Sequence, residues 1–165
     1  MQRGEPASDE TTIDYLADRI DHLTTLAGWH FDAFGYLNPG NTSERYVERL
    51  EQSLRRDDMP MTVVAIRANR VLGSASLVRK TITHPHLTPW LSSVFVAPDQ
   101  RGEGLGSALV SRIESEAARL GFGHLHLFTP RSEGLYARLG WSLVEYSRHR
   151  DLKIAIMSKS IERPA

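Results

Sequence analysis

The stretch VFVAPDQRGEGLGSALV, residues 94–110, decides how the middle of this chain folds. Its β-branched and aromatic beginning predicts a strand that ends before Pro98. Three glycines follow at alternate positions, 102, 104 and 106, and the apolar residues after them recur with helical spacing. We therefore expect a strand, a glycine-rich turn and a helix, in that order.

A turn of this kind is suited to binding a phosphate. The first N–H groups of a helix have no intrahelical acceptor, and the helix dipole adds partial positive charge there. Ser107 adds a hydroxyl and Arg101 a positive charge. The alternative is a tight turn that needs glycine only for its φ freedom. The spacing G-x-G-x-G matches neither the Walker loop nor the dinucleotide fingerprint G-x-G-x-x-G.

Composition narrows the class of protein. The chain has 165 residues, 20 basic and 20 acidic side chains, and no cysteine. This length fits one domain, and the charge balance lacks the basic footprint of nucleic-acid binding. Without cysteine there are no disulfides, thiolate metal sites or cysteine nucleophiles. With no membrane span in the sequence, we expect a cytoplasmic protein with a single domain over 12–165 and a flexible N-terminus over 1–11.

The pattern of apolar residues predicts a mixed sheet with helices. Strands are expected over 12–16, 61–67, 71–79, 90–96, 124–128, 141–146 and 154–161. Helices are expected between Asp18 and Asn38, from Asn41 or Thr42 to about Arg55, over 104–120 and over 133–139. Asp18 is the expected N-cap of the first helix, and Glu44 is placed for a capping-box contact in the second. Residues 68–70 are the expected turn of a β-hairpin, and 81–89 form a loop.

Two motifs resemble a known superfamily. Residues 94–107, VFVAPDQRGEGLGS, resemble the acyl-CoA signature of the GNAT superfamily of N-acetyltransferases, and LYARLGW at 135–141 resembles its second hallmark, a tyrosine before a glycine–aromatic pair. The order of elements fits over nearly the whole chain. The resemblance implies an α+β fold in three layers. Its mixed, mostly antiparallel sheet would have about six or seven strands, be splayed at the acyl-CoA strand, and be flanked by about four helices.

The resemblance also implies how acetyl-CoA is bound as co-substrate, with no metal. The strand before the turn would carry a bulge, and the pantetheine arm would enter the gap beside it. Backbone groups of Val94 and Val96, with Phe95 between them, would contact that arm and the acyl carbonyl. The pyrophosphate would lie on the turn formed by Arg101, Gly102, Glu103, Gly104, Leu105, Gly106 and Ser107. Thr129 stands where many members have an asparagine and is a further candidate contact.

Tyr136 matches the superfamily's tyrosine that approaches the CoA sulfur. A phenol can give a proton to the thiolate that leaves when an amine attacks the thioester. The alternative is a half-buried aromatic residue with no catalytic role. Many members place a glutamate on the strand before the turn, but residues 91–96, LSSVFV, include no acid. The general base is therefore not identified by the motif.

Histidines and aromatic residues offer further candidates. His84 and His86 lie in the loop before the acyl-CoA strand, where either imidazole could act as a base, although exposed loop histidines are the simpler interpretation. His124 and His126 share one strand face and, without acidic or cysteine partners at ligand spacing, are interpreted as packed or surface residues. The cluster Trp29, His30, Phe31 and Phe34 either walls an acceptor site or belongs to the core.

These observations lead to an expected function. The chain is expected to transfer an acetyl group from acetyl-CoA to a primary amine by direct attack, since a cysteine acyl-enzyme is impossible. The acceptor would be a small-molecule amine or a peptide or protein N-terminus, with no nucleic-acid or membrane partner and with a homodimer as one possible assembly. The alternatives are an acetyl-CoA-binding sensor without turnover, and an enzyme that uses a longer acyl-CoA.

Overall fold

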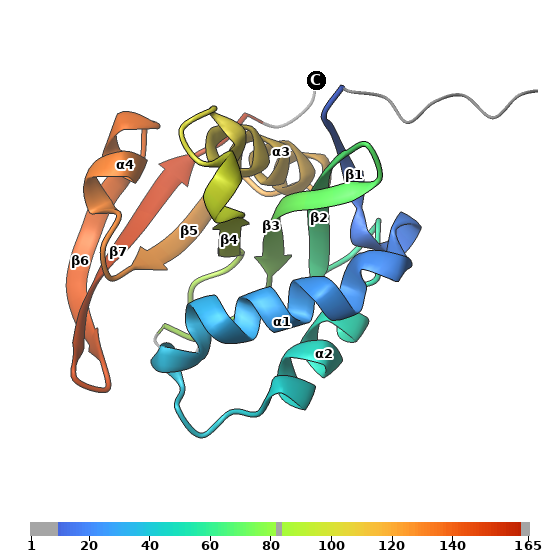
Figure 1. The fold of residues 1–165 in the computed structure, drawn as a ribbon. Coiled ribbons are helices and arrows are strands. Elements are labelled where there is room, and N and C mark those ends of the chain that lie inside the picture. The colour runs from blue at the N-terminus through green and yellow to red at the C-terminus, as the bar shows by residue number, and fades with distance from the viewer. Residues whose placement is uncertain (1–9, 82–83, 163–165) are drawn as a thin grey trace, which may run out of the picture.

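The computed structural model describes residues 10–81 and 84–162 and contains one seven-stranded sheet. The strands are β1 Thr12–Tyr15, β2 Met61–Arg67, β3 Arg70–Val78, β4 Trp90–Val96, β5 His124–Thr129, β6 Ser142–His149 and β7 Leu152–Ser160. Their order is β1-β2-β3-β4-β5-β7-β6, and neighbours are antiparallel except for β4 and β5. Four α-helices flank the sheet: α1 Leu23–Phe34, α2 Ser43–Gln52, α3 Leu105–Arg119 and α4 Glu133–Arg138 (Figure 1). The expected mixed, mostly antiparallel sheet is confirmed.

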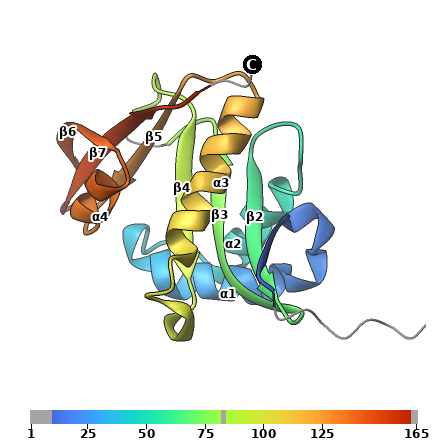
Figure 2. The same cartoon turned by 90° about the horizontal axis from the view of Figure 1, so that it is seen from above.

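The sheet separates two layers of helices. Alternate residues of β2 point to opposite faces, so that Val63 belongs to the core under α3 while Val64 belongs to the core under α1 and α2. On α3, apolar residues at 105, 109, 113 and 117 are buried at helical spacing. Figure 2 shows α3 lying across the strands, with α1 and α2 beyond them. The three-layer arrangement follows from these two periodicities.

Three local predictions were wrong, and the expected start of the second helix near Asn41 or Thr42 was confirmed. Asp18 does not cap α1; it lies in a 3₁₀ turn, and α1 begins five residues later at Leu23. Thr42 does cap α2, since its hydroxyl accepts from the Arg45 N–H at 3.4 Å. Glu44 is the second residue of that helix, one position too early for a capping box.

The third wrong prediction concerns the β2–β3 turn. It has two residues, not three, because Arg67 pairs with Arg70. Ala68 and Asn69 both have positive φ, 51° and 60°, the backbone of a two-residue turn that matches strand twist. Asn69 tolerates this conformation well, and Ala68 less so.

Candidate active site

Strands β4 and β5 run parallel but separate along their length. Within the described residues their only register pair is Trp90 with His126, beside which the His126 N–H donates to the Pro89 carbonyl oxygen at 3.0 Å. From there β4 continues to Val96 and β5 to Thr129. Figure 2 shows the two strands diverging. The sheet therefore has a V-shaped gap, closed at Trp90 and open toward the glycine turn, as expected.

A bulge in β4 exposes backbone groups along this gap. Ser74 pairs with Phe95 and Ser76 with Ser92, so that Ser93 and Val94 together face the single residue between them on β3. Ser93 has a φ of 54°, and such a bulge leaves one residue outside the ladder. The side chains of Val94 and Val96 pack on the α3 side, whereas Phe95 packs on the α1 side. The edge of β4 that borders the gap is therefore main chain.

The glycine turn joins this strand to α3. Gly102 and Gly104 have φ values of +86° and +78°, which a β-carbon disfavours, and Gly104 is the N-cap of α3. The first α-helical bond runs from the Ala108 N–H to the Gly104 carbonyl at 3.1 Å. The N–H groups at 105, 106 and 107 therefore have no acceptor within the helix. A β-carbon on Gly102 or Gly104 would meet no atom within 4 Å, so the space beside these donors suits a phosphate group.

Side chains around the turn hold its shape. Leu105 is buried in the core and fixes the start of the helix. Arg101 is exposed, and its Nε donates to the Val96 carbonyl oxygen at 3.2 Å. Glu103 is also exposed and lies 3.8 Å from Arg67. Arg101 can therefore add positive charge to an anion at the turn, and a contact between Glu103 and the cofactor stays a prediction.

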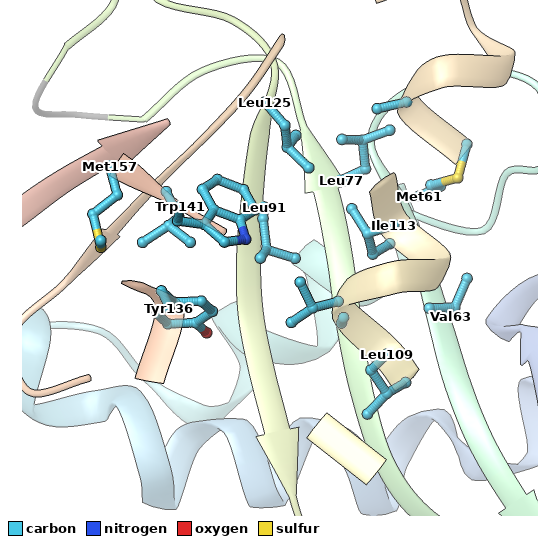
Figure 3. Packing of buried hydrophobic residues seen from close by; sticks show 14 of the residues in the cluster. Met61, Val63, Leu77, Leu91, Leu109, Ile113, Leu125, Tyr136, Trp141 and Met157 are labelled. Carbon is cyan, nitrogen blue, oxygen red and sulfur yellow. The ribbon is translucent and has the colours of Figure 1, made fainter. Parts of the chain in front are cut away.

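Tyr136 is held by packing alone. The residue is 9% exposed on α4, and its ring meets that of Trp141 edge-on with 6.1 Å between centroids. Figure 3 shows both rings beside Leu91 of β4. Burial raises the pKa of Tyr136 to about 12. Among the described residues its hydroxyl has no hydrogen-bond partner, so this protonated phenol is free to donate to a ligand.

Thr129 has a local structural task. Its buried hydroxyl accepts from the backbone N–H of Ser132 at 2.9 Å and of Arg131 at 3.4 Å. These bonds shape the turn from β5 into α4, and so place Tyr136. Its contact with a cofactor stays a prediction.

The aromatic residues of α1 form a wall on the opposite face. The rings of Trp29, His30 and Phe34 lie 5.4, 6.2 and 6.5 Å from that of Phe95, while Phe31 turns away toward Tyr46. His30 is buried beside the Ser74 hydroxyl at 2.8 Å, and burial lowers the pKa of His30 to about 4. The imidazole is therefore neutral at physiological pH.

A cleft of about 430 Å³ adjoins this aromatic wall. Trp29 and Asp32 border it from α1, Arg70 from β3, and Arg101 from the glycine turn. It therefore lies between α1 and the start of β3, beside the turn that follows β4, and none of its lining residues belongs to β5.

The four candidate histidines of the loop and of β5 differ in how accessible they are. His84 Nε2 lies 2.5 Å from Glu145 of β6, and its Nδ1 is enclosed without a partner. His86 and His124 are exposed. His126 is half-buried, with its ring 5.5 Å from that of Trp90. No group of three or more His, Asp or Glu side chains in the described ranges is arranged to hold a metal ion.

Two contacts between distant segments near the site were not predicted from the sequence. His149 Nε2 donates to the Leu37 carbonyl oxygen at 2.8 Å, and the Arg131 guanidinium lies 5.1 Å from the centre of the Tyr36 ring. They join the segment after α1 to β6 and to the β5–α4 turn. No local pattern signals such pairs, because their partners are about a hundred residues apart.

Comparison with protein families agrees with this geometry. The family described as "Acetyltransferase (GNAT) family" matches residues 23–141, which include the gap, the glycine turn and Tyr136. The chain belongs to the GNAT acetyltransferase family. A search of curated proteins gives no significant match. No helix in the part of the chain that the structure describes is long and apolar enough to cross a membrane.

Solved GNAT structures share the fold at low sequence identity. An aminoglycoside 6'-acetyltransferase type Ii is 19% identical with a TM-score of 0.71, covering 93% of this chain and 99% of that one. A ribosomal-protein-alanine N-acetyltransferase from Brucella melitensis is 21% identical with a TM-score of 0.70, covering 91% and 99%. A putative acetyltransferase from Salmonella typhimurium, solved with its cofactor acetyl-CoA, is 20% identical with a TM-score of 0.69, covering 94% and 96%.

Proposed function

We propose that this GNAT domain, residues 12–165, transfers an acetyl group from acetyl-CoA to a primary amine by direct attack in a ternary complex. The observation that carries the proposal is the V-shaped gap between β4 and β5, which opens toward the free helix N-terminus at Gly104. A phosphate-binding turn at the mouth of a slot lined by main chain suits a long, flexible thioester such as acetyl-CoA.

The chain's own groups would hold this co-substrate in sequence along the slot. Free N–H groups at 105–107 would bind the pyrophosphate, with Arg101 supplying charge. Main-chain groups of Val94 and Val96 would pair with the pantetheine arm, as an added strand pairs with a sheet edge. Because Arg101 already donates to the Val96 carbonyl oxygen, it ties the turn to this edge.

Tyr136 would act as general acid. Its pKa of about 12 keeps the phenol protonated throughout the physiological range, so that it is always ready to donate. A proton given to the sulfur as the tetrahedral intermediate collapses helps CoA to leave as the thiol. The absence of cysteine supports direct transfer, because it excludes an acyl-enzyme linked through a thioester.

The acceptor class is supported by the similar structures. One is named for acetylation of an aminoglycoside and another for acetylation of the alanine of a ribosomal protein. We therefore propose a small-molecule amine or a peptide or protein N-terminus, reached in the cytoplasm from the α1 side of the sheet. A homodimer remains part of the proposal.

Acetyl-CoA binding and transfer test the proposal. Isothermal titration measures binding, and a panel of aminoglycosides, polyamines and N-terminal peptides is assayed for release of free CoA thiol, which no protein thiol obscures. Tyr136→Phe should lower kcat by about 10²-fold or more and leave the Kd for acetyl-CoA unchanged. Tyr146→Phe, which removes an exposed hydroxyl bound to Glu133 at 2.8 Å, is the control. Absence of acetyl-CoA binding contradicts the proposal.

A second function is an acetyl-CoA sensor without turnover. It is favoured by the lack of any carboxylate on residues 91–96. A sensor would bind acetyl-CoA but acetylate none of the panel, and Tyr136→Phe would change neither property. The same experiment therefore separates the two.

A further inference from the structure

We propose that His126 is the general base of the acetyl transfer and takes the proton of the acceptor ammonium at its Nε2 atom. The inference rests on the proposed acetyltransferase function. It assigns the one role that the sequence motifs leave open, since β4 offers only Ser92 and Ser93 near the gap.

The position of His126 along the gap favours this role. His126 is the β5 residue that pairs with Trp90, at the closed end of the V-shaped gap. The glycine turn lies past the other end of β4. A CoA molecule whose phosphates lie on that turn, with its arm along β4, therefore points its acyl end toward Trp90 and His126. Phe128, two residues further along β5, faces the same side.

The hydrogen bond of His126 fixes which nitrogen is basic. Nδ1 lies 3.1 Å from the Pro89 carbonyl oxygen, which can only accept, so Nδ1 carries the hydrogen. The same carbonyl accepts from the His126 backbone N–H at 3.0 Å, which holds it in place. In a neutral imidazole the lone pair is then on Nε2. No described residue forms a hydrogen bond with Nε2.

The surroundings keep the ring neutral. Burial lowers the pKa of His126 below that of a free imidazole; the Pro89 hydrogen bond opposes this shift, and neighbouring His124 adds to it. His84 lies on the other side of Trp90, with its ring 6.4 Å from the indole, and it contacts Glu145 of β6. His86 lies beyond His84. The ring is thus uncharged near pH 7 and can accept a proton.

His84 is the strongest competitor, and its geometry is less suitable. Its Nε2 is engaged by Glu145, and its Nδ1 is enclosed without reaching any polar group. Only His126 among these imidazoles combines a fixed tautomer, an unoccupied nitrogen and a place at the closed end of the gap.

Two protons leave the acceptor nitrogen during the transfer. His126 Nε2 accepts one proton from the ammonium and later releases it to solvent. The neutral nitrogen forms a bond to the acyl carbon, and the bond from that carbon to sulfur breaks. Tyr136 gives its proton to the sulfur and is reprotonated by the second proton lost from the nitrogen. The products are the acetylated amine, CoA thiol and one proton.

The assignment is tested by measuring the kinetics of the His126→Gln variant. The acceptor is the amine of the panel that the wild-type enzyme acetylates fastest. We expect kcat/KM at pH 7 to fall by about 10²-fold or more, with an unchanged Kd for acetyl-CoA. For the wild-type enzyme, kcat/KM should rise with pH and level off above the pKa of His126. The variant's profile should keep rising toward the pKa of the amine, so that the deficit shrinks at high pH. His84→Gln and His86→Gln are the controls, because neither residue is among the groups that shift the pKa of His126.

A variant that retains wild-type kcat/KM and its pH profile overturns the assignment, as does an equal loss in His84→Gln. A second measurement needs no acceptor. Nitrogen-15 NMR of the labelled wild-type protein should show His126 at pH 7 as the neutral tautomer with hydrogen on Nδ1. Hydrogen on Nε2, or a charged ring, contradicts the proposal even if no amine in the panel is acetylated. Failure of acetyl-CoA to bind would instead contradict the proposed function itself.

Discussion

Substitution of Gly104 by alanine should weaken CoA binding by somewhat more free energy than it removes from the stability of the fold. Gly104 has a φ of +78°, and an added β-carbon meets no atom within 4 Å. The only structural penalty is therefore backbone strain, about 1–2 kcal/mol for a left-handed non-glycine residue. For a chain of this size that corresponds to a decrease in Tm of roughly 2–8 °C.

The effect on binding has a different origin. The methyl group of alanine would project into the open space beside the N–H groups at 105–107. A phosphate pushed away from one of these donors loses a hydrogen bond to a charged group, worth about 1.5–3 kcal/mol. The Kd for acetyl-CoA should then rise about 10- to 100-fold.

Gly121 provides a matched control at the other end of the same helix. Its φ is +98°, and its β-carbon would also meet no atom within 4 Å. Gly121→Ala should therefore lower Tm by a similar amount and leave the Kd unchanged. Differential scanning fluorimetry and isothermal titration measure the two quantities on each variant. Equal Kd values for Gly104→Ala and Gly121→Ala would refute the idea that the turn binds phosphate.

Two further predictions concern stability. Glu116 is buried and accepts hydrogen bonds from Tyr15, Arg112 and Arg119 at 2.8–3.0 Å. Glu116→Gln should therefore lower the free energy of unfolding, measured with urea, by about 2–3 kcal/mol. The exposed Glu51→Gln is the control and should stay within about 0.5 kcal/mol of the wild type. Burial of His30 lowers its pKa to about 4, below an unfolded value near 6.5, so its contribution is complete above pH 6.5 and disappears as pH falls toward 4. Between pH 6.5 and 4 the free energy of unfolding should therefore fall by about 3 kcal/mol more in the wild type than in His30→Gln. An equal dependence on pH in the two proteins would contradict this prediction.

Local patterns predicted the elements that build the cofactor side of the site. The strand ending before Pro98, the glycine turn and the buried stripe of α3 all depend on residues close in sequence, and all were confirmed. Helix starts were harder, because capping depends on one or two residues. Asp18 has the right side chain for an N-cap, but the chain first forms two short 3₁₀ turns before α1 begins.

The acceptor side could not be predicted, because it depends on contacts between distant segments. The sequence places His124 and His126 on one strand face but does not tell that only His126 lies against Trp90 and Pro89. Likewise, the stretch THPH at 83–86 suggests that His84 and His86 are equivalent. In the structure, Glu145, some 60 residues later, contacts His84. These differences arise from the packing of a loop over strands that come later in the chain.

The gap between β4 and β5 raises the question of what holds the two halves of the sheet together. Backbone pairing does so only at Trp90, among the described residues. On one face the α3 core supplies the connection, since it packs Leu91 of β4 with Leu127 of β5. On the other, the segment after α1 reaches β6 through His149 and the β5–α4 turn through Arg131. Side chains above and below thus replace the missing ladder, and the main-chain groups along the gap stay free for a ligand.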